Sequence, residues 1–275
     1  MFDRHIIEEA LPKVEHTPVA HYTRIGTLCH FIPHGTCGWG SAWATPVQFL
    51  NDRMDLLLGL EELLEAANQP PRAEGRVRYS IEQLRVAGGA LETDAFQLSF
   101  SGDPDELGQW RGYAANGMGC AVITDAVAVK KVGDVAGWVI YDPRERDAFA
   151  SKTLERLRKE TDDRLIQQAL VASASYMKHE GFSPEKEFRL LKFADPEDVK
   201  FRERDDRLVP YIDCLDGASP LPVDRILIGP GWQLSRLSDA EKTQHHVVQG
   251  IQRLLTARGL NSTDIGVSKI PYDPR

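Results

Sequence analysis

The sequence predicts an α+β protein with a mixed or mostly antiparallel sheet flanked by helices. Short apolar segments of strand length occur between longer segments whose apolar residues recur at helical spacing. About seven strands and four or five helices follow in irregular order, without the strand–helix alternation of a doubly wound fold. The phosphate-binding patterns GxGxxG and GxxxxGK[ST] do not occur.

The first third of the chain contains short strands and two helices. An apolar face formed by Met54, Leu57, Leu60 and Leu64 predicts an amphipathic helix, which Asn51-Asp52 can cap. The stretch NQPPRAEG then separates it from a second helix. The predicted elements are an extended segment at 20–22, a helical turn at 25–32, a strand at 42–45, and helices at 53–67 and 77–89.

The rest of the chain carries most of the predicted sheet. Residues 146–179 form the longest helical region, because their apolar residues keep helical spacing throughout. In the strand EKEFRLLKF, the period of two places Glu187, Arg189 and Leu191 on one face. The predicted strands are 96–101, 119–124, 137–142, 185–193, 207–214, 223–231 and 265–272, and a helix covers 238–258.

We expect a single domain over residues 1–275. No linker is rich enough in Pro, Gly or Ser to divide the chain. The helices around 53–90 then form a helical insertion, and residues 146–180 form a long helical region of the same domain.

Composition and charge narrow the classes of partner. The 275 residues carry a formal net charge of −8, which disfavours duplex nucleic acid as a partner. We find no secretory signal and no apolar run of the roughly 18 residues that a membrane helix needs. The prediction is a cytoplasmic protein with no membrane partner.

The cysteines and histidines do not predict a metal site. Cys29 and Cys37, with His30 and His34 between them, match no common zinc spacing, and the four cysteines indicate reduced thiols. The pair His245-His246 is a poor chelate, because adjacent helical residues point about 100° apart. A metal-dependent hydrolase is therefore the weakest hypothesis, and we expect no metal.

The segment FQLSFSGDPDELGQWRGYAANGMGCAV, residues 96–122, is unusual. Between two predicted strands it places Trp110, Arg111 and Tyr113 together. One interpretation is structural: Trp110 fills the core and Arg111 pairs with a nearby acid such as Asp103. The other is a pocket for a flat, anionic ligand, in which the ring and the guanidinium both contact the ligand.

Six blocks in order resemble a bacterial family known as the domain of unknown function 2971. They are HYTRIGTL, WATPVQFLND, the 96–122 segment, EKEFRLL, ILIGPG and VSKIPY, and they extend from about His21 to Tyr272. The resemblance implies no activity.

A second resemblance is to the ADP-ribosyltransferase superfamily. His21 with Thr23 is similar to its first motif, Trp43-Ala44-Thr45 stands near its second, and Glu185-Lys186-Glu187 is similar to its late acidic motif. Trp43 stands where a tyrosine is usual, and some 140 residues separate the last two motifs. The resemblance implies an ADP-ribosyltransferase-like fold, with NAD as the substrate.

That resemblance assigns roles that chemistry supports. Cleavage of the nicotinamide–ribose bond builds positive charge on the sugar, which Glu187 can stabilise, with Glu185 as the alternative acid. Nicotinamide needs an aromatic platform and the diphosphate a guanidinium. The predicted cofactor-binding residues are His21, Thr23, Trp43, Trp110, Arg111 and Tyr113.

Two functional hypotheses follow. The first is an NAD-using enzyme, an ADP-ribosyltransferase or NAD glycohydrolase, of the toxin-like or phage-defence kind. Its partners are a small-molecule nucleotide and a protein acceptor. The second is a non-catalytic module that senses a nucleotide or binds a protein through the same residues.

Overall fold

The computed structural model describes residues 5–50, 53–69, 75–87, 94–204, 206–215, 220–232 and 240–272. The chain forms two compact units, and each is built from three separate stretches of sequence. Unit 1 consists of Met1–Val14, Trp43–Leu98 and Gly133–Ile212, and unit 2 consists of Glu15–Ala42, Ser99–Val132 and Asp213–Arg275. The predicted α+β class with a mixed, mostly antiparallel sheet is confirmed.

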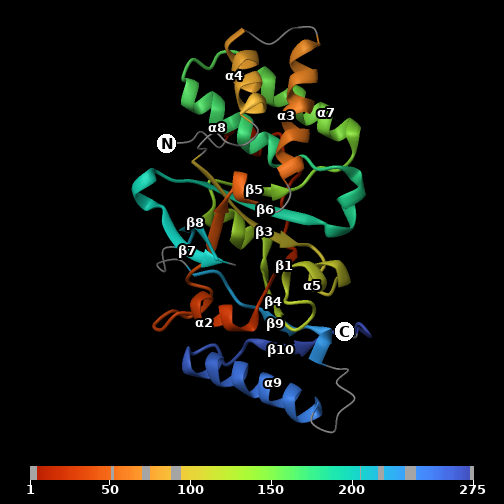
Figure 1. Ribbon diagram of the computed structural model, residues 1–275, viewed down its shortest axis with the longest axis vertical. Coiled ribbons are helices and arrows are strands. Elements are labelled where there is room, and N and C mark those ends of the chain that lie inside the picture. The colour runs from red at the N-terminus through yellow and green to blue at the C-terminus, as the bar shows by residue number, and fades with distance from the viewer. Residues whose placement is uncertain are drawn as a thin grey trace. The chain divides into compact units, whose positions relative to one another are not determined.

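Unit 1 combines a group of helices with strands. Its longer helices α3, α4, α7 and α8 lie together (Figure 1). Its helices are α1 (His5–Glu8), α3 (Arg53–Asn68), α4 (Gly75–Val86), α7 (Pro143–Leu157), α8 (Asp163–Ala174), and the 3₁₀ turns η2 (Val47–Phe49), η3 (Glu180–Glu185) and η4 (Pro196–Asp198).

The strands of unit 1 follow the order β5-β6-β3-β2-β8-β7. The pairs β5–β6, β3–β2 and β8–β7 are antiparallel. Strand β3 gives its first four residues to unit 1 and its remaining residues to unit 2. The strands are β2 (Trp43–Pro46), β3 (Ala95–Ser101), β5 (Val135–Trp138), β6 (Glu187–Phe193), β7 (Lys200–Arg204) and β8 (Arg207–Asp213).

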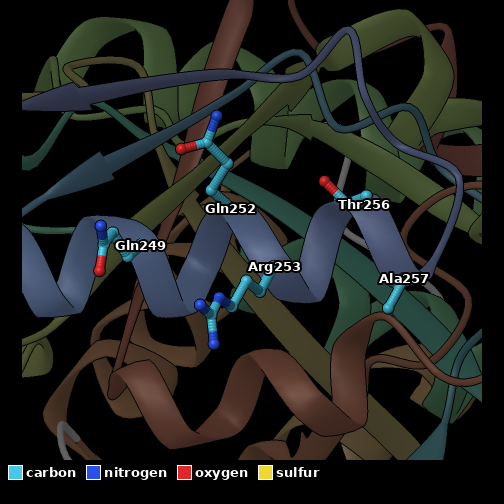
Figure 2. A pocket seen from close by; sticks show the side chains of 5 residues that line it. All are labelled: Gln249, Gln252, Arg253, Thr256 and Ala257. Atoms are coloured by element: carbon cyan, nitrogen blue, oxygen red, sulfur yellow. The ribbon is translucent and has the colours of Figure 1, made fainter.

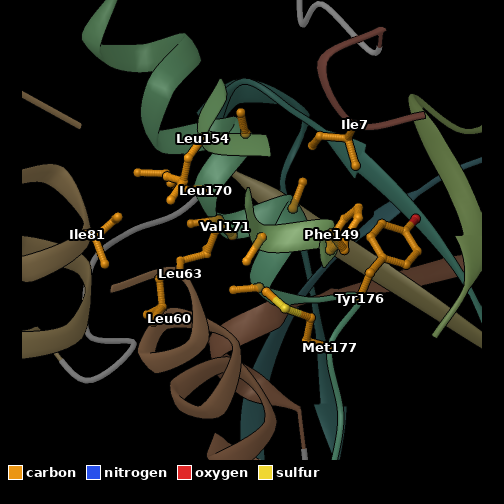
Figure 3. Packing of buried hydrophobic residues seen from close by; sticks show 14 of the residues in the cluster. Ile7, Leu60, Leu63, Ile81, Phe149, Leu154, Leu170, Val171, Tyr176 and Met177 are labelled. Atoms are coloured by element: carbon orange, nitrogen blue, oxygen red, sulfur yellow. The ribbon is translucent and has the colours of Figure 1, made fainter. Parts of the chain in front are cut away.

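The core of unit 1 is apolar and lies among the helices and one face of the strands. Leu63 of α3, Ile81 of α4 and Leu170 of α8 are fully buried there (Figure 3). A Cβ at Gly59 would lie 2.4 Å from the carbonyl oxygen of Ala174, so α3 and α8 approach closely only because this residue is glycine.

The long helical region that the sequence predicts at 146–179 contains two helices, each with its own capping residue. Asp142 caps α7 by accepting from the backbone N–H groups of Arg144 and Glu145. Asp162 caps α8 in the same way, and the chain between the two helices leaves the helical conformation. The region is therefore two helices, α7 and α8, that pack on α3.

Unit 2 is built on antiparallel strands with one parallel pair. Strand β1 pairs antiparallel with β3 and β4, β4 pairs antiparallel with β9, and β9 pairs parallel with β10. Helix α9 lies beside β10 (Figure 1). The strands are β1 (Pro18–Thr23), β4 (Cys120–Asp125), β9 (Arg225–Ile228) and β10 (Asp264–Val267). The helices are α2 (Leu28–Phe31), α5 (Leu107–Tyr113), α6 (Ala126–Val132), α9 (Ala240–Ala257), η1 (Ile25–Thr27) and η5 (Pro230–Trp232).

The structure adds elements that the sequence patterns do not predict, namely α1, α5, α6 and the edge strand β7. Helix α5 occupies the segment between β3 and β4, and its cap Glu106 accepts from the N–H of Gln109 at 2.7 Å. The predicted cap Asn51-Asp52 lies outside the described residues. Among the described residues, every helix is too short or too polar to cross a membrane.

Candidate functional site

The ionic group in unit 1 begins with two residues of β6. Glu187 and Arg189 are two positions apart on a strand, so both side chains lie on the same face, as predicted. Arg189 Nη2 donates to Glu187 Oε2 at 2.6 Å, and Nη1 donates to the carbonyl oxygen of Ser175. Both residues are buried.

A lysine and an aspartate from other segments complete the group. Lys178 follows α8, and its Nζ lies 2.7 Å from Glu185, 3.1 Å from Asp55 and 3.5 Å from Glu187. Asp55, in the first turn of α3, also accepts from Arg189 Nη2 at 3.1 Å. We call these five residues the Lys178 network: Asp55, Lys178, Glu185, Glu187 and Arg189.

The two cations of the network are held in their charged forms. Burial alone lowers the pKa of Lys178, but attraction to Glu187 and the hydrogen bond to Glu185 outweigh it, so that the pKa is raised. Burial likewise opposes the charge of Arg189, and Glu187 and Asp55 raise its pKa on balance. Each cation therefore needs its carboxylate partners, because an unpaired buried charge is costly.

Glu185 differs from the other carboxylates of the network. It ends η3, and Lys186 after it has a left-handed backbone with φ of 44°, so the strand begins only at Glu187. The side chain of Glu185 is 24% exposed, whereas that of Glu187 is 10% exposed. Burial raises the pKa of Glu185 above its ordinary value, Lys178 opposes this, and the charges of Glu187 and Asp55 add to it.

Aromatic side chains border the network. The Tyr141 hydroxyl accepts from the backbone N–H of Glu187 at 2.9 Å, and burial raises its pKa, with a further contribution from the Glu187 charge. The Phe182 ring lies 4.7 Å from Lys178 Nζ in a cation–π contact. The network thus offers one accessible carboxylate with a perturbed pKa beside a lysine, which is an arrangement suited to proton transfer.

Trp43 lies apart from these residues on β2 of the same unit. It is half-buried, and its ring contacts that of Tyr211 at 5.2 Å between centroids. The Arg202 guanidinium lies over it, 5.1 Å from the ring centroid. The Trp43 ring, which the sequence predicts as a platform for nicotinamide, is therefore in contact with Arg202 of the same chain.

His21 and Thr23 lie on β1 in unit 2. His21 Nδ1 makes a hydrogen bond of 2.9 Å with the carbonyl oxygen of Ser99, and rings surround it. Those of Phe31, Trp39 and Phe100 have centroids 5.5 to 5.9 Å away. Thr23 is buried.

Trp110, Arg111 and Tyr113 lie on α5 and differ in exposure. Trp110 is fully buried, and its Nε1 donates to Asp105 Oδ1 at 2.8 Å. Its ring meets that of Tyr22 edge-on at 4.7 Å. Arg111 and Tyr113 are exposed. The structure thus gives Trp110 the core position of the structural interpretation, with no ring face open to a ligand.

The predicted site residues divide between the units. Glu185 and Glu187 are brought together by Lys178, and Trp43 belongs to the same unit. The remaining predicted residues belong to unit 2, and a site shared by all of them stays a prediction. That second group is His21, Thr23, Trp110, Arg111 and Tyr113.

Three important residues of the Lys178 network and its border are absent from the sequence-based prediction: Asp55, Tyr141 and Lys178. Arg189 is part of that prediction, because its spacing from Glu187 places both on one strand face. Asp55 reads as an ordinary acid in the first turn of a helix, where the helix dipole favours it. The pairing of Asp55 with Arg189 joins residues 134 positions apart, which no local pattern reveals.

Two other features of the described residues carry less chemistry. No group of three or more His, Cys, Asp or Glu side chains among them is arranged to hold a metal ion. A hollow on α9 is lined by Gln249, Gln252, Arg253, Thr256 and Ala257, and Figure 2 shows Gln252 and Arg253 extending in different directions from the helix. These residues supply no carboxylate.

Comparison with known families identifies one match. A family model described as "Protein of unknown function (DUF2971)" matches residues 109–190, which run from α5 to β6 and include Lys178, Glu185, Glu187 and Arg189. The predicted resemblance to this family is confirmed over that range, which is less than a third of the chain. Neither a curated protein nor a solved structure gives a match. The similarity to ADP-ribosyltransferases stays a prediction.

Proposed function

We propose that this chain cleaves the nicotinamide–ribose bond of NAD and transfers ADP-ribose to water or to an acceptor. The observation that carries the proposal is the convergence of two glutamates on Lys178, with the more exposed Glu185 having a raised pKa. Enzymes that cleave a bond at an anomeric carbon usually use a pair of carboxylates in different environments.

The reaction itself explains why carboxylates suffice. Nicotinamide leaves with the electron pair of the broken C–N bond, and the positively charged pyridinium becomes a neutral base. The leaving group therefore needs no proton. What remains is positive charge on the ribose, which a carboxylate stabilises, and a proton on the attacking nucleophile, which a carboxylate accepts.

The exposures of the two glutamates suggest how they divide this work. Glu187 contacts both Arg189 and Lys178, and its charge is largely compensated by these two cations. Glu185 contacts Lys178 and retains more than twice the exposed fraction of side chain. We therefore assign substrate contact to Glu185 and the positioning of Lys178 and Arg189 to Glu187. The acidic motif alone assigns substrate contact to Glu187 and makes Glu185 the alternative acid, so our assignment exchanges these two roles.

Incubation of the purified protein with NAD, followed by chromatographic measurement of nicotinamide, tests the proposal. We expect release by the unaltered protein and a loss of about 100-fold or more in Glu185→Gln, since a placed charge is worth about 3 kcal/mol. Glu180→Gln is the matched control, because Glu180 is an exposed acid of the same η3 segment. Equal rates for Glu185→Gln and Glu180→Gln, or no release by the unaltered protein, would overturn the proposal.

One observation favours a second function, a non-catalytic module that senses a nucleotide. The buried members of the Lys178 network are paired charge to charge, as expected of an element that fixes a structure. Calorimetric binding of NAD without nicotinamide release would support this function. Nicotinamide release by the unaltered protein that is lost in Glu185→Gln would exclude the non-catalytic function.

A further inference from the structure

Unit 1 carries a second polar group on its strands, away from the Lys178 network in sequence. The Arg202 guanidinium of β7 lies 5.1 Å from the ring centroid of Trp43 and 5.7 Å from that of Tyr211. Its Nη2 donates to Thr45 Oγ1 at 3.4 Å. We call Trp43, Arg202 and Tyr211 the arginine clamp, and all three residues are half-buried.

A second cation stands beside the clamp. Lys200 is exposed, lies two residues before Arg202 on β7, and pairs in register with Tyr211 of β8. Side chains two apart on a strand, and those directly opposite on a paired strand, share a face of the sheet. The two cations and the two aromatic rings therefore lie on the same face.

The clamp also shares a face of the strands with Glu187. Thr45 and Gln97 are register partners, so Gln97 lies on the face of Trp43 and Thr45. Ala95, two residues before Gln97, belongs to the same buried cluster as Leu191, which is two residues after Arg189. Because β3 lies between β6 and β2, the separation of β6 and β2 is about 10 Å.

These features describe a binding site for a particular chemistry. An aromatic ring gives a nucleobase a surface to stack on, and a guanidinium that is already held by two rings binds phosphate with little further loss of conformational entropy. Lys200 adds a second positive charge suited to a diphosphate. We propose that Trp43, Arg202, Tyr211 and Lys200 bind the adenosine diphosphate part of the nucleotide substrate. This inference rests on the proposed function for the identity of the whole substrate.

Binding of ADP, measured by titration calorimetry, tests the clamp without any bond cleavage. We expect Arg202→Gln and Trp43→Leu each to weaken ADP binding by about 10-fold, as loss of a charge-assisted contact or a stacking surface predicts. Arg144→Gln and Trp138→Leu are matched controls. Arg144 is an exposed arginine of α7, and Trp138 packs on Phe188, which alternates with Arg189 onto the other face of β6. Neither control should alter the affinity.

The outcomes separate this inference from the proposed function. The protein could bind ADP in a way that depends on Arg202 and Trp43 and yet release no nicotinamide. That result would support the arginine clamp as a binding site and overturn the proposed enzymatic activity. Nicotinamide release with an unchanged KM in Arg202→Gln retains the enzyme and overturns the clamp. The milder variants Arg202→Lys and Trp43→Phe should give intermediate affinities. No ADP binding by the unaltered protein, or affinities within twofold in all four variants, also overturns the clamp.

Discussion

The two units stabilise their partly or fully buried carboxylates in different ways. In unit 2, Asp105 accepts from three neutral donors: Trp110 Nε1 at 2.8 Å, the Ser268 hydroxyl at 2.6 Å and the backbone N–H of Lys269 at 3.1 Å. In unit 1, the Lys178 network balances three carboxylates against two cations. We call Asp105 with Trp110 and Ser268 the Asp105 cluster.

The difference indicates where chemistry is available. The Asp105 cluster pairs its carboxylate with uncharged groups that fix α5 and the chain after β10, around a tryptophan that no ligand can reach. The Lys178 network has one acid more than it has bases, and the surplus falls on Glu185, the most exposed carboxylate of the group. A raised pKa on an accessible acid is the property that an acid–base catalyst needs.

The largest effect on stability is expected from Glu187→Gln. The substitution removes a charge that faces Arg189 at 2.6 Å and Lys178 at 3.5 Å in a buried setting. Breaking a buried pair by removing one partner costs about 3 kcal/mol or more. Urea unfolding should show this loss, and a change below about 1 kcal/mol would mean that solvent reaches the network.

Asp105→Ala comes next and tests the Asp105 cluster. The variant leaves Trp110 Nε1 buried without its acceptor and removes the bonds to Ser268 and Lys269. We expect a loss of about 2 kcal/mol in the free energy of unfolding. Nicotinamide release should persist in this variant under conditions in which the protein is folded. Loss of release in a fully folded variant would instead indicate that the catalytic residues belong to unit 2.

The sequence predicts the strands of this protein better than the partners of its charges. Alternation in EKEFRLLKF correctly places Glu187 and Arg189 on one face, because a strand has a fixed period of two. The sequence does not predict that Lys178 and Asp55 belong to this site. Lys178 lies in a loop after α8 and Asp55 at the start of α3, and only tertiary packing brings them to β6. Glu185 reaches Lys178 from a 3₁₀ turn rather than from the strand.

The segment 96–122 shows a second limit. Composition alone leaves Trp110 equally suited to a core and to a ligand platform, since both use a large ring with a polar N–H. The structure resolves this through α5, a short helix that turns Trp110 inward and leaves Arg111 and Tyr113 outside. Helical spacing separates adjacent residues by about 100°, so neighbours in the sequence have opposite environments.

Glu185→Gln should change stability little, and the size of the change depends on pH. The folded pKa of Glu185 is raised, so the stability that its protonated form contributes is present at acidic pH and is lost as the pH rises through that pKa. Gln stays neutral at every pH, and so the variant should equal or slightly exceed the unaltered protein at neutral pH. The two should converge at acidic pH in thermal unfolding curves.

The same raised pKa predicts the pH dependence of turnover. If Glu185 is the base, the unaltered protein should lose activity as the pH falls through a value above the ordinary glutamate pKa. The residual activity of Glu185→Gln should lack this limb. A limb that survives in Glu185→Gln would assign it to another group, and the perturbed acid of unit 1 would then have no role in catalysis.

The smallest effect is expected from Arg111→Gln, which compares one arginine in each unit. Arg111 is exposed on α5, and substitutions at exposed sites usually change stability by less than about 0.5 kcal/mol. The sequence alone favours Arg111 for the diphosphate, whereas the packing of Arg202 between Trp43 and Tyr211 favours unit 1.

An arginine that rings hold in place binds an anion at lower entropic cost than an exposed one. ADP titrations should therefore show a smaller loss of affinity in Arg111→Gln than in Arg202→Gln. The reverse order would place the anion-binding group on α5 and remove the clamp from the substrate site.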